Sequence, residues 1–198
     1  MSALFPELTR PRAARCCALT LVATLTLLVG CAPGADLPLL SQPQTGAYRL
    51  GGSDEIRVIT FGEDQLTGSF RVDDQGNIAL PLVGIVHGAG LTPAQLQDWI
   101  TDRLVQQKLL LHPSVAVEVL SYRPIFVLGE VAKPGVYPYQ PGMTMLTVIA
   151  VAGGFTYRGV QSYASDVRTT GGVVQEGRIT PRSFVAPGDV IKVFERRF

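Results

Sequence analysis

Cysteine is scarce in this chain of 198 residues: its three copies, Cys16, Cys17 and Cys31, all lie near the N-terminus. The sequence after Cys31 therefore has no residue for an intramolecular disulfide, a cysteine nucleophile or a thiolate metal site. Histidine occurs only as His87, in a predicted turn, and His112, at a predicted helix–strand junction. We interpret both as surface residues, and we expect neither a metal nor a cofactor.

Sequence patterns of catalysis and of nucleic-acid binding are also missing. The chain has no Gly-x-Ser-x-Gly, no glycine-rich phosphate loop and no His-Glu-x-x-His. The adjacent Asp73 and Asp74 lie in a turn-forming stretch, where carboxylates usually bond their own backbone. After the three Arg and one Glu of residues 1–30 are set aside, 14 basic residues face 15 acidic ones. We therefore expect neither an enzyme nor a nucleic-acid-binding protein, and no basic stretch stands out as a membrane-surface patch.

The N-terminal segment has the order of a secretory signal. Three Arg precede an apolar run over 17–29, which is shorter than the roughly 18–20 residues that span a bilayer. The run ends in Leu28-Val29-Gly30-Cys31, which resembles the bacterial lipobox. The resemblance implies a signal peptide over 1–30 and acylation of Cys31, and Ala32 after the cysteine favours outer-membrane delivery. An ordinary signal peptide that happens to contain a cysteine is the alternative.

Periodicity predicts a mixed α and β chain after a flexible Pro- and Gly-rich tether over 31–46. Expected strands cover 56–60, 68–72, 78–82, 115–119, 125–128 and 190–193. One helix should begin after Thr92, with Pro93 at its first position and Gln95 completing a capping box. A short second helix should follow Thr144 and run to Val151.

Two short stretches before predicted strands are similar to each other. Asp54-Glu55-Ile56-Arg57-Val58 corresponds position by position to Asp189-Val190-Ile191-Lys192-Val193. Each Asp follows a small residue, and we expect it to accept a backbone N–H as the chain leaves a turn.

The turn residues together resemble the outer-membrane polysaccharide export family. In the first half the resemblance rests on Tyr48-Arg49-Leu50-Gly51-Gly52-Ser53-Asp54, on the Val72–Gly84 stretch, on Ala89-Gly90-Leu91-Thr92 and on His112-Pro113-Ser114-Val115. In the second half Val127–Val131, Pro134–Tyr137, Ala152–Phe155 and Pro187–Ile191 resemble a soluble-ligand-binding β-grasp (SLBB) module. Gly52-Ser53 departs from the Pro-Gly that the family commonly has before this Asp.

The resemblance implies an α+β fold with two domains. A polysaccharide-export-type β-sheet and helix domain should cover 47–121, and a β-grasp-like SLBB domain should cover 122–198. We interpret the motif residues as turns that define the fold rather than as ligands. They are Tyr48, Gly52, Asp54, Asp73, Gly76, Pro81, Gly84, Gly90, Pro113, Gly129, Pro134, Gly135, Gly153, Gly154, Gly188 and Asp189.

The same resemblance implies a non-enzymatic export component of capsule or exopolysaccharide. We expect an outer-membrane lipoprotein that faces the periplasm and forms a homo-oligomeric ring, of unknown size, around the polysaccharide path. An inner-membrane polysaccharide co-polymerase, often linked to a tyrosine kinase, is the implied partner. Because the sequence shows no closing amphipathic helix, we hypothesise that an outer-membrane β-barrel protein completes the passage. The alternative is a monomeric periplasmic module that binds a glycan or small ligand.

Overall fold

The structure, a computed structural model, describes residues 32–43 and 46–197. The predicted signal peptide and Cys31 lie outside the described residues. Two hydrophobic cores organise the described part. The first is built from buried residues between Leu50 and Val115, and the second from buried residues between Ile125 and Val193. The helices and sheets together confirm the expected α+β class.

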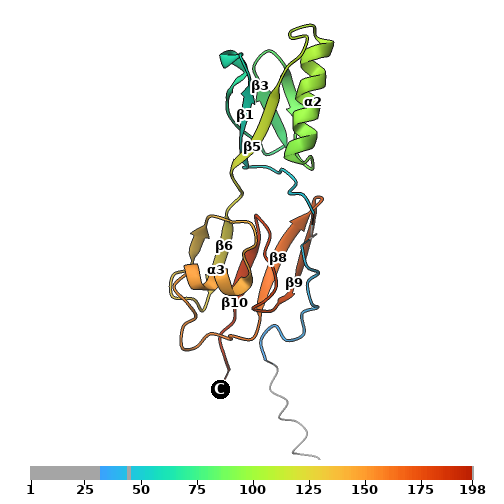
Figure 1. Ribbon diagram of the computed structural model, residues 1–198. Helices are drawn as coiled ribbons and strands as arrows, with labels where there is room; N and C mark the ends of the chain where they lie inside the picture. The colour runs from blue at the N-terminus through green and yellow to red at the C-terminus, as the bar shows by residue number, and fades with distance from the viewer. Residues whose placement is uncertain (1–31, 44–45, 198) are drawn as a thin grey trace, which may run out of the picture. The chain divides into compact units, whose positions relative to one another are not determined.

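The first domain is a small antiparallel sheet with one helix packed against it (Figure 1). Strand β1 (Glu55–Thr60) lies between β2 (Gly68–Arg71) and β5 (Val115–Ser121). Strands β3 (Asn77–Leu80) and β4 (Gly84–His87) form a separate hairpin, and a 3-10 helix, η1, covers Asp64–Leu66. His87, which we placed in a turn, instead ends β4, where its Nδ1 lies 3.1 Å from the Asn77 Oδ1.

Helix α2 (Pro93–Gln106) begins as its sequence predicts. The Gln95 N–H donates to the Thr92 hydroxyl over 3.2 Å, and the Thr92 N–H donates to the Gln95 side chain over 3.0 Å. Its buried side chains are Leu96, Ile100 and Leu104, spaced four residues apart so that they share one face. Trp99 and Arg103 are both exposed, with the guanidinium 5.9 Å from the indole ring.

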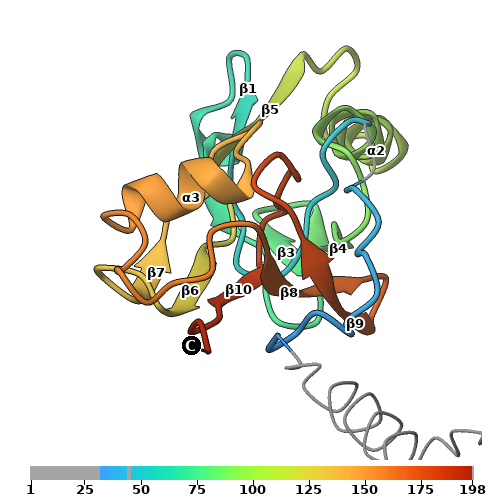
Figure 2. The same ribbon diagram turned by 90° about the horizontal axis from the view of Figure 1, so that it is seen from below.

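The second domain is a mixed five-stranded sheet with a short helix packed against it (Figures 1 and 2). Its strand order is β7 (Gly135–Tyr137), β6 (Ile125–Gly129), β10 (Val190–Val193), β8 (Ala164–Thr170) and β9 (Val173–Ile179). Only the β6–β10 pair among these is parallel. Helix α3 (Met145–Val151) buries Met145, Val148 and Ile149 in the second core, and the Thr144 hydroxyl accepts the Thr147 N–H as predicted.

Residues 33–43, which we call the strap, lie along the second domain instead of forming a free tether. The Leu40 N–H donates to the Arg178 carbonyl over 2.9 Å, and the Arg178 N–H donates to the Pro38 carbonyl over 2.7 Å. The strap thus extends the sheet beside β9, where Figures 1 and 2 show it in blue. Its approach requires Gly177, because a Cβ atom there would lie 2.9 Å from the Leu40 Cβ. The expectation of a flexible tether is therefore wrong for these residues.

Candidate functional site

The turns that hold Asp54 and Asp189 have the same hydrogen-bonding geometry. The Gly51 N–H donates to the Asp54 carboxylate over 2.8 Å, and the Asp54 N–H donates to the Gly51 carbonyl over 3.1 Å. In the second turn the Ala186 N–H donates to the Asp189 carboxylate over 2.6 Å, and the Asp189 N–H donates to the Ala186 carbonyl over 3.2 Å. Both aspartates are fully buried. The similarity seen in the sequence is therefore confirmed as a repeated turn before β1 and β10.

The two turns differ at the residue before the aspartate. Gly188 has a φ of +88°, and Ser53, at the same position of the first turn, has a φ of +73°. A residue with a Cβ atom loses about 1–2 kcal/mol in this left-handed conformation. The departure from the family's Pro-Gly thus places a strained serine before Asp54.

Replacing Ser53 with glycine should therefore stabilise the protein. We expect the free energy of unfolding to rise by roughly 0.5–1 kcal/mol, because relief of the strained φ exceeds the added entropy of glycine in the unfolded chain. Chemical denaturation followed by the fluorescence of Trp99 measures this change in the first domain. Ser69→Gly, in the exposed row of β2, is the matched control and should lower the stability. Equal destabilisation by both variants would contradict the assignment of strain to Ser53.

Asp54 also joins the start of the first domain to the residues that follow β5. Its carboxylate accepts the Arg123 N–H over 2.9 Å and the Tyr48 hydroxyl over 2.5 Å, and it lies 3.5 Å from the Arg123 Nε. Burial, and then the hydrogen bond to Asp54, raises the pKa of Tyr48, so the phenol stays a neutral donor. The Tyr122 ring packs edge-on against Tyr48, with centroids 4.8 Å apart. These contacts hold the chain where it leaves β5.

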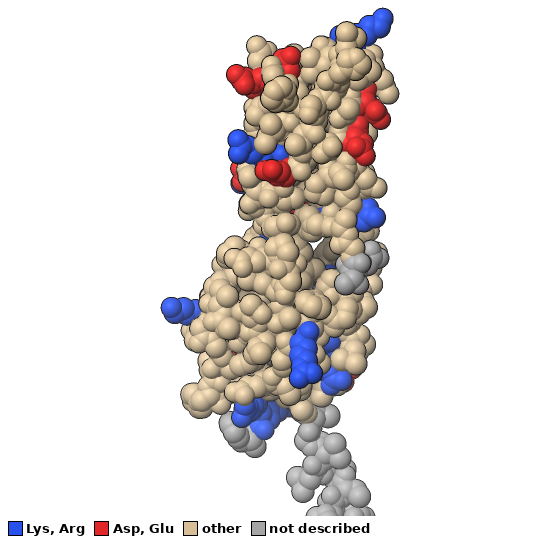
Figure 3. Space-filling model, in the orientation of Figure 1, with Lys and Arg blue, Asp and Glu red and all other residues tan. Residues whose placement is uncertain are grey.

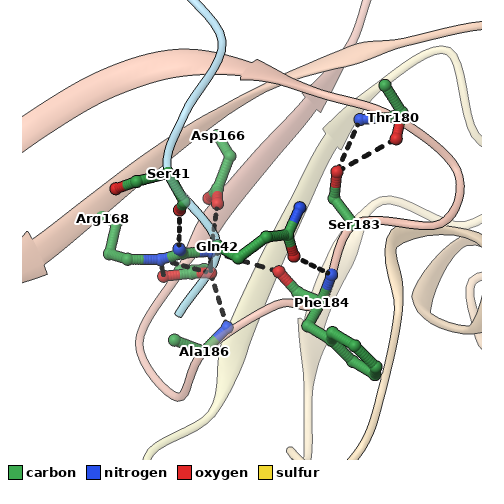
Figure 4. A network of polar contacts seen from close by, with 9 residues as sticks. Ser41, Gln42, Asp166, Arg168, Thr180, Ser183, Phe184 and Ala186 are labelled. Atoms are coloured by element: carbon green, nitrogen blue, oxygen red, sulfur yellow. Dashed lines mark hydrogen bonds and ion pairs between the residues drawn. The ribbon is translucent and has the colours of Figure 1, made fainter. Parts of the chain in front are cut away.

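Arg168 joins the second aspartate turn to the strap (Figure 4). Its guanidinium donates to both Asp189 oxygens over 2.7–3.1 Å and to Asp166 over 2.9 Å. The same guanidinium donates to the Ser41 carbonyl over 3.0 Å. The Phe184 N–H donates to the Gln42 side chain over 3.0 Å. The strap is therefore bound to the second domain through a buried ion cluster as well as through β9.

The cluster contains two carboxylates for one guanidinium. Burial, and then the negative charge of Asp189, raises the pKa of Asp166 to about 8. Burial alone would lower the pKa of Arg168, but its bonds to Asp189 and Asp166 outweigh this and leave it raised. Asp166 Oδ1 has no hydrogen-bond partner among the described residues. The cluster therefore holds one proton at neutral pH.

This proton makes the stability depend on pH. The folded protein binds it more tightly than the unfolded chain, so the stabilisation is complete below about pH 4 and is lost as the pH rises to about 8. Asp166→Asn should remove most of the change in the free energy of unfolding between pH 4 and pH 8. Urea denaturation at several pH values, followed by circular dichroism, measures it. Glu176→Gln, on the exposed part of β9, is the control, and a slope unchanged in Asp166→Asn would contradict the assignment.

The other predicted turn residues lie at or beside turns, but two of the glycines lack the left-handed backbone conformation. A positive φ is found at Gly76, Gly84, Gly90, Gly129, Gly153, Gly154 and Gly188, but not at Gly52 or Gly135. Asp73 accepts the N–H groups of Gln75 and Asn77, as expected for a turn. Pro81 lies between β3 and β4, Pro113 between α2 and β5, and Pro134 directly before β7. Gly135 is the first residue of β7, just as Gly84 is the first residue of β4 and Gly129 the last of β6.

Gly76 is a turn glycine that leaves no room for a side chain. Its φ is +83°, and a Cβ atom there would overlap the Cβ of Ala89. A Cβ atom on Gly135, in contrast, would come no closer than 3.9 Å to the Tyr137 ring. A side chain is therefore excluded at Gly76 and tolerated at Gly135.

Across 32–43 and 46–197, three or more His, Asp or Glu side chains nowhere gather as they would around a metal ion. In the same ranges, no helix combines the length and the apolar character needed to cross a membrane. In the first turn the Asp54 carboxylate is bonded to the backbone, and in the second the Asp189 carboxylate is bonded to Arg168 and to the backbone. The arrangement therefore fixes the positions of the chain segments around each turn.

Two known family models match the sequence, one over the residues of the first core and one over part of the second. The sequence model of the family described as "Polysaccharide biosynthesis/export protein" matches residues 42–120, and that of the SLBB domain matches residues 124–175. The chain belongs to the polysaccharide export family.

Three relatives have names that refer to polysaccharides. The exopolysaccharide production protein ExoF of Rhizobium meliloti is 35% identical over 121 residues, and the polysialic acid transport protein KpsD of Escherichia coli is 33% identical over 109 residues; each match covers 54% of this chain. The EPS I polysaccharide export outer membrane protein EpsA of Ralstonia nicotianae is 27% identical over 174 residues, or 81% of this chain. The matches span 28%, 19% and 44% of these relatives, which are longer than the matched region.

Sequence reasoning found Asp54 and Asp189 but missed Asp166 and Arg168. Asp166 and Arg168 lie two positions apart on β8, so their side chains share one face of the sheet. An Asp-x-Arg pair in a strand with few other charges was the available signal. The strap itself carries no such signal, because its prolines and glycine are typical of a linker.

Proposed function

We propose that this chain is a non-enzymatic, lipid-anchored component of a machine that exports capsular or extracellular polysaccharide. The observation that carries the proposal is the order of its parts: a lipobox-like sequence, then a polysaccharide export domain, then an SLBB domain. Cys31 is the proposed site of acylation. The proposed location is the periplasmic face of the outer membrane, which agrees with the outer-membrane name of EpsA.

The proposed assembly is a ring of identical subunits around the polymer path. A ring needs two different surfaces on each subunit that fit one another with a rotation that closes. One suitable surface lies on the open face of the second sheet, where Phe126 and Val136 are cross-strand partners and Leu128 follows on the same side of β6. Phe126 is 38% exposed, Leu128 48% and Val136 60%, so together they form an apolar strip. The inner-membrane co-polymerase is the proposed second partner.

Deleting the chromosomal gene and measuring polysaccharide inside and outside the cell tests the role in export. We expect surface polysaccharide to disappear and to return with the wild-type gene. Unchanged surface polysaccharide in the deletion strain would contradict the proposal.

Light scattering on purified, delipidated protein tests the ring. We expect a particle of several subunits, and Leu128→Asp should reduce it to monomers with unchanged circular dichroism. Glu176→Gln, on the exposed part of β9, is the control and should keep the particle size. A monomeric wild-type protein whose thermal stability rises with a glycan would instead favour the ligand-binding module.

A further inference from the structure

The near-zero net charge of the chain conceals two domains of opposite charge. Residues 46–121 hold five Lys and Arg against nine Asp and Glu, whereas residues 122–197 hold nine against five. When the buried cluster of Asp166, Arg168 and Asp189 is left out, the second domain has eight basic residues for three acidic ones. On the face in Figure 3, Asp and Glu gather over the first domain and the second shows mainly Lys and Arg. A basic surface therefore exists that the total charge does not reveal.

Part of this basic surface is organised around two aromatic rings. The Arg178 guanidinium lies 5.6 Å from the centre of the Tyr163 ring, and the Lys192 ammonium lies 5.8 Å from the centre of the Phe194 ring. The two rings are themselves 6.1 Å apart. We call Tyr163, Arg178, Lys192 and Phe194 the basic–aromatic cluster. It comes from β8, β9 and β10 and the residues next to them, so the sheet fixes its geometry.

Two more cations continue the basic–aromatic cluster. Arg196 and Arg197 follow Glu195, whose carboxylate pairs with Arg158, and both arginines are exposed. The Arg196 Nε donates to the Gly159 carbonyl over 2.8 Å, which holds this part of the chain against the domain. The surface therefore presents several cations at defined positions.

The start of the strap lies directly on the basic–aromatic cluster. The Tyr163 hydroxyl donates to the Pro33 carbonyl over 3.0 Å, and the Arg178 guanidinium donates to the Ala35 carbonyl over 3.1 Å. Between them, Gly34 lies so close to the Phe194 ring that a Cβ atom would overlap it. Pro33 is only two residues after Cys31. Two residues of extended chain span at most about 7 Å, so an acyl chain on Cys31 would enter the membrane beside these cations.

We propose that the basic–aromatic cluster, with Arg196 and Arg197, binds the anionic headgroups of the membrane into which the Cys31 lipid inserts. This inference rests on the proposed lipidation of Cys31. Cations attract anionic lipid headgroups, and aromatic side chains favour the membrane–water interface. Because the strap is bound to the second domain, the lipid holds that domain, and not the acidic first domain, against the membrane surface. The short connection also raises the local concentration of headgroups at the cluster.

Vesicle sedimentation with the unlipidated mature chain, Cys31→Ser, tests the surface without the anchor. We expect binding to vesicles of phosphatidylglycerol and phosphatidylcholine, weaker binding to phosphatidylcholine alone, and release by salt. Lys192→Gln with Arg197→Gln should weaken binding by roughly 25-fold, at about fivefold for each cation. The matched control is Arg57→Gln with Lys108→Gln in the first domain, which should bind like the parent protein.

Equal binding to both kinds of vesicle, or no effect of the Lys192 and Arg197 changes, would overturn the inference. Binding of soluble alginate with no binding to anionic vesicles would overturn it too, because it would identify an anionic polymer as the ligand. Mass spectrometry of the wild-type protein tests acylation of Cys31 separately. A failed lipid anchor and a failed headgroup surface therefore give different results.

Discussion

Replacing Arg168 with methionine should lower the free energy of unfolding by about 3–5 kcal/mol, a large share of the stability of a domain this size. Arg168 is 6% exposed, and its guanidinium faces the carboxylates of Asp166 and Asp189. Methionine keeps part of the side-chain volume but leaves the Asp189 carboxylate without a countercharge and removes the donor that bonds to both Asp166 and Asp189. It also removes the hydrogen bond that holds the Ser41 carbonyl, so the strap should loosen with the domain.

Two spectroscopic signals separate the domains in this experiment. Trp99 is the only tryptophan and lies on α2, so its fluorescence reports the first domain. Circular dichroism reports both domains. In Arg168→Met we expect the circular dichroism transition to move to lower denaturant while the fluorescence transition stays, because the two cores are separate. Arg182→Met, at an exposed position of the same domain, should change the stability by less than about 0.5 kcal/mol. Similar stability of the two variants would contradict the role of Arg168.

Features that depend on neighbouring residues were predictable from the sequence. The capping box of α2 and the N–H bonds of Asp54 and Asp189 join residues three positions apart. Such bonds depend on local backbone geometry, which the residue types Thr, Gln, Gly and Asp largely determine. The same reasoning identified the place of Ser53 as a departure from the family, and the structure gives the reason, a positive φ at that residue.

Features that depend on distant residues were not predictable. Arg168 bonds to Ser41, 127 positions away, and to Asp189, 21 positions away, and no periodicity relates such residues. The strap has the composition of a linker, yet it lies along the sheet because Gly177 opens the space beside β9. The total charge likewise predicted no basic surface, because charges of opposite sign in the two domains cancel in the sum.

Loss of the proposed anchor should have the largest effect on function. We expect Cys31→Ser, exported with an ordinary cleavable signal peptide, to be folded, soluble in the periplasm and deficient in polysaccharide export. The fold should persist because the contacts of the strap with the second domain are made by Pro33 and later residues. Export should fail because a tethered protein meets its membrane partners at a local concentration higher by a factor of about 100 or more.

Cell fractionation and measurement of surface polysaccharide in the same strain check this prediction. Cys16→Ser and Cys17→Ser are matched controls: both cysteines precede the lipobox-like sequence, so these variants should stay in the membrane fraction and export normally. A soluble Cys31→Ser protein that supports normal export would show that partners alone hold the assembly in place.

A single acyl chain binds membranes only marginally, whereas several chains, or one chain with a basic patch, bind stably. Adding Lys192→Gln and Arg197→Gln to the lipidated protein should therefore leave it in the membrane fraction, because the triacylated cysteine implied by the lipobox is sufficient by itself. The basic surface would then orient the second domain on the membrane, and the lipid would keep it there.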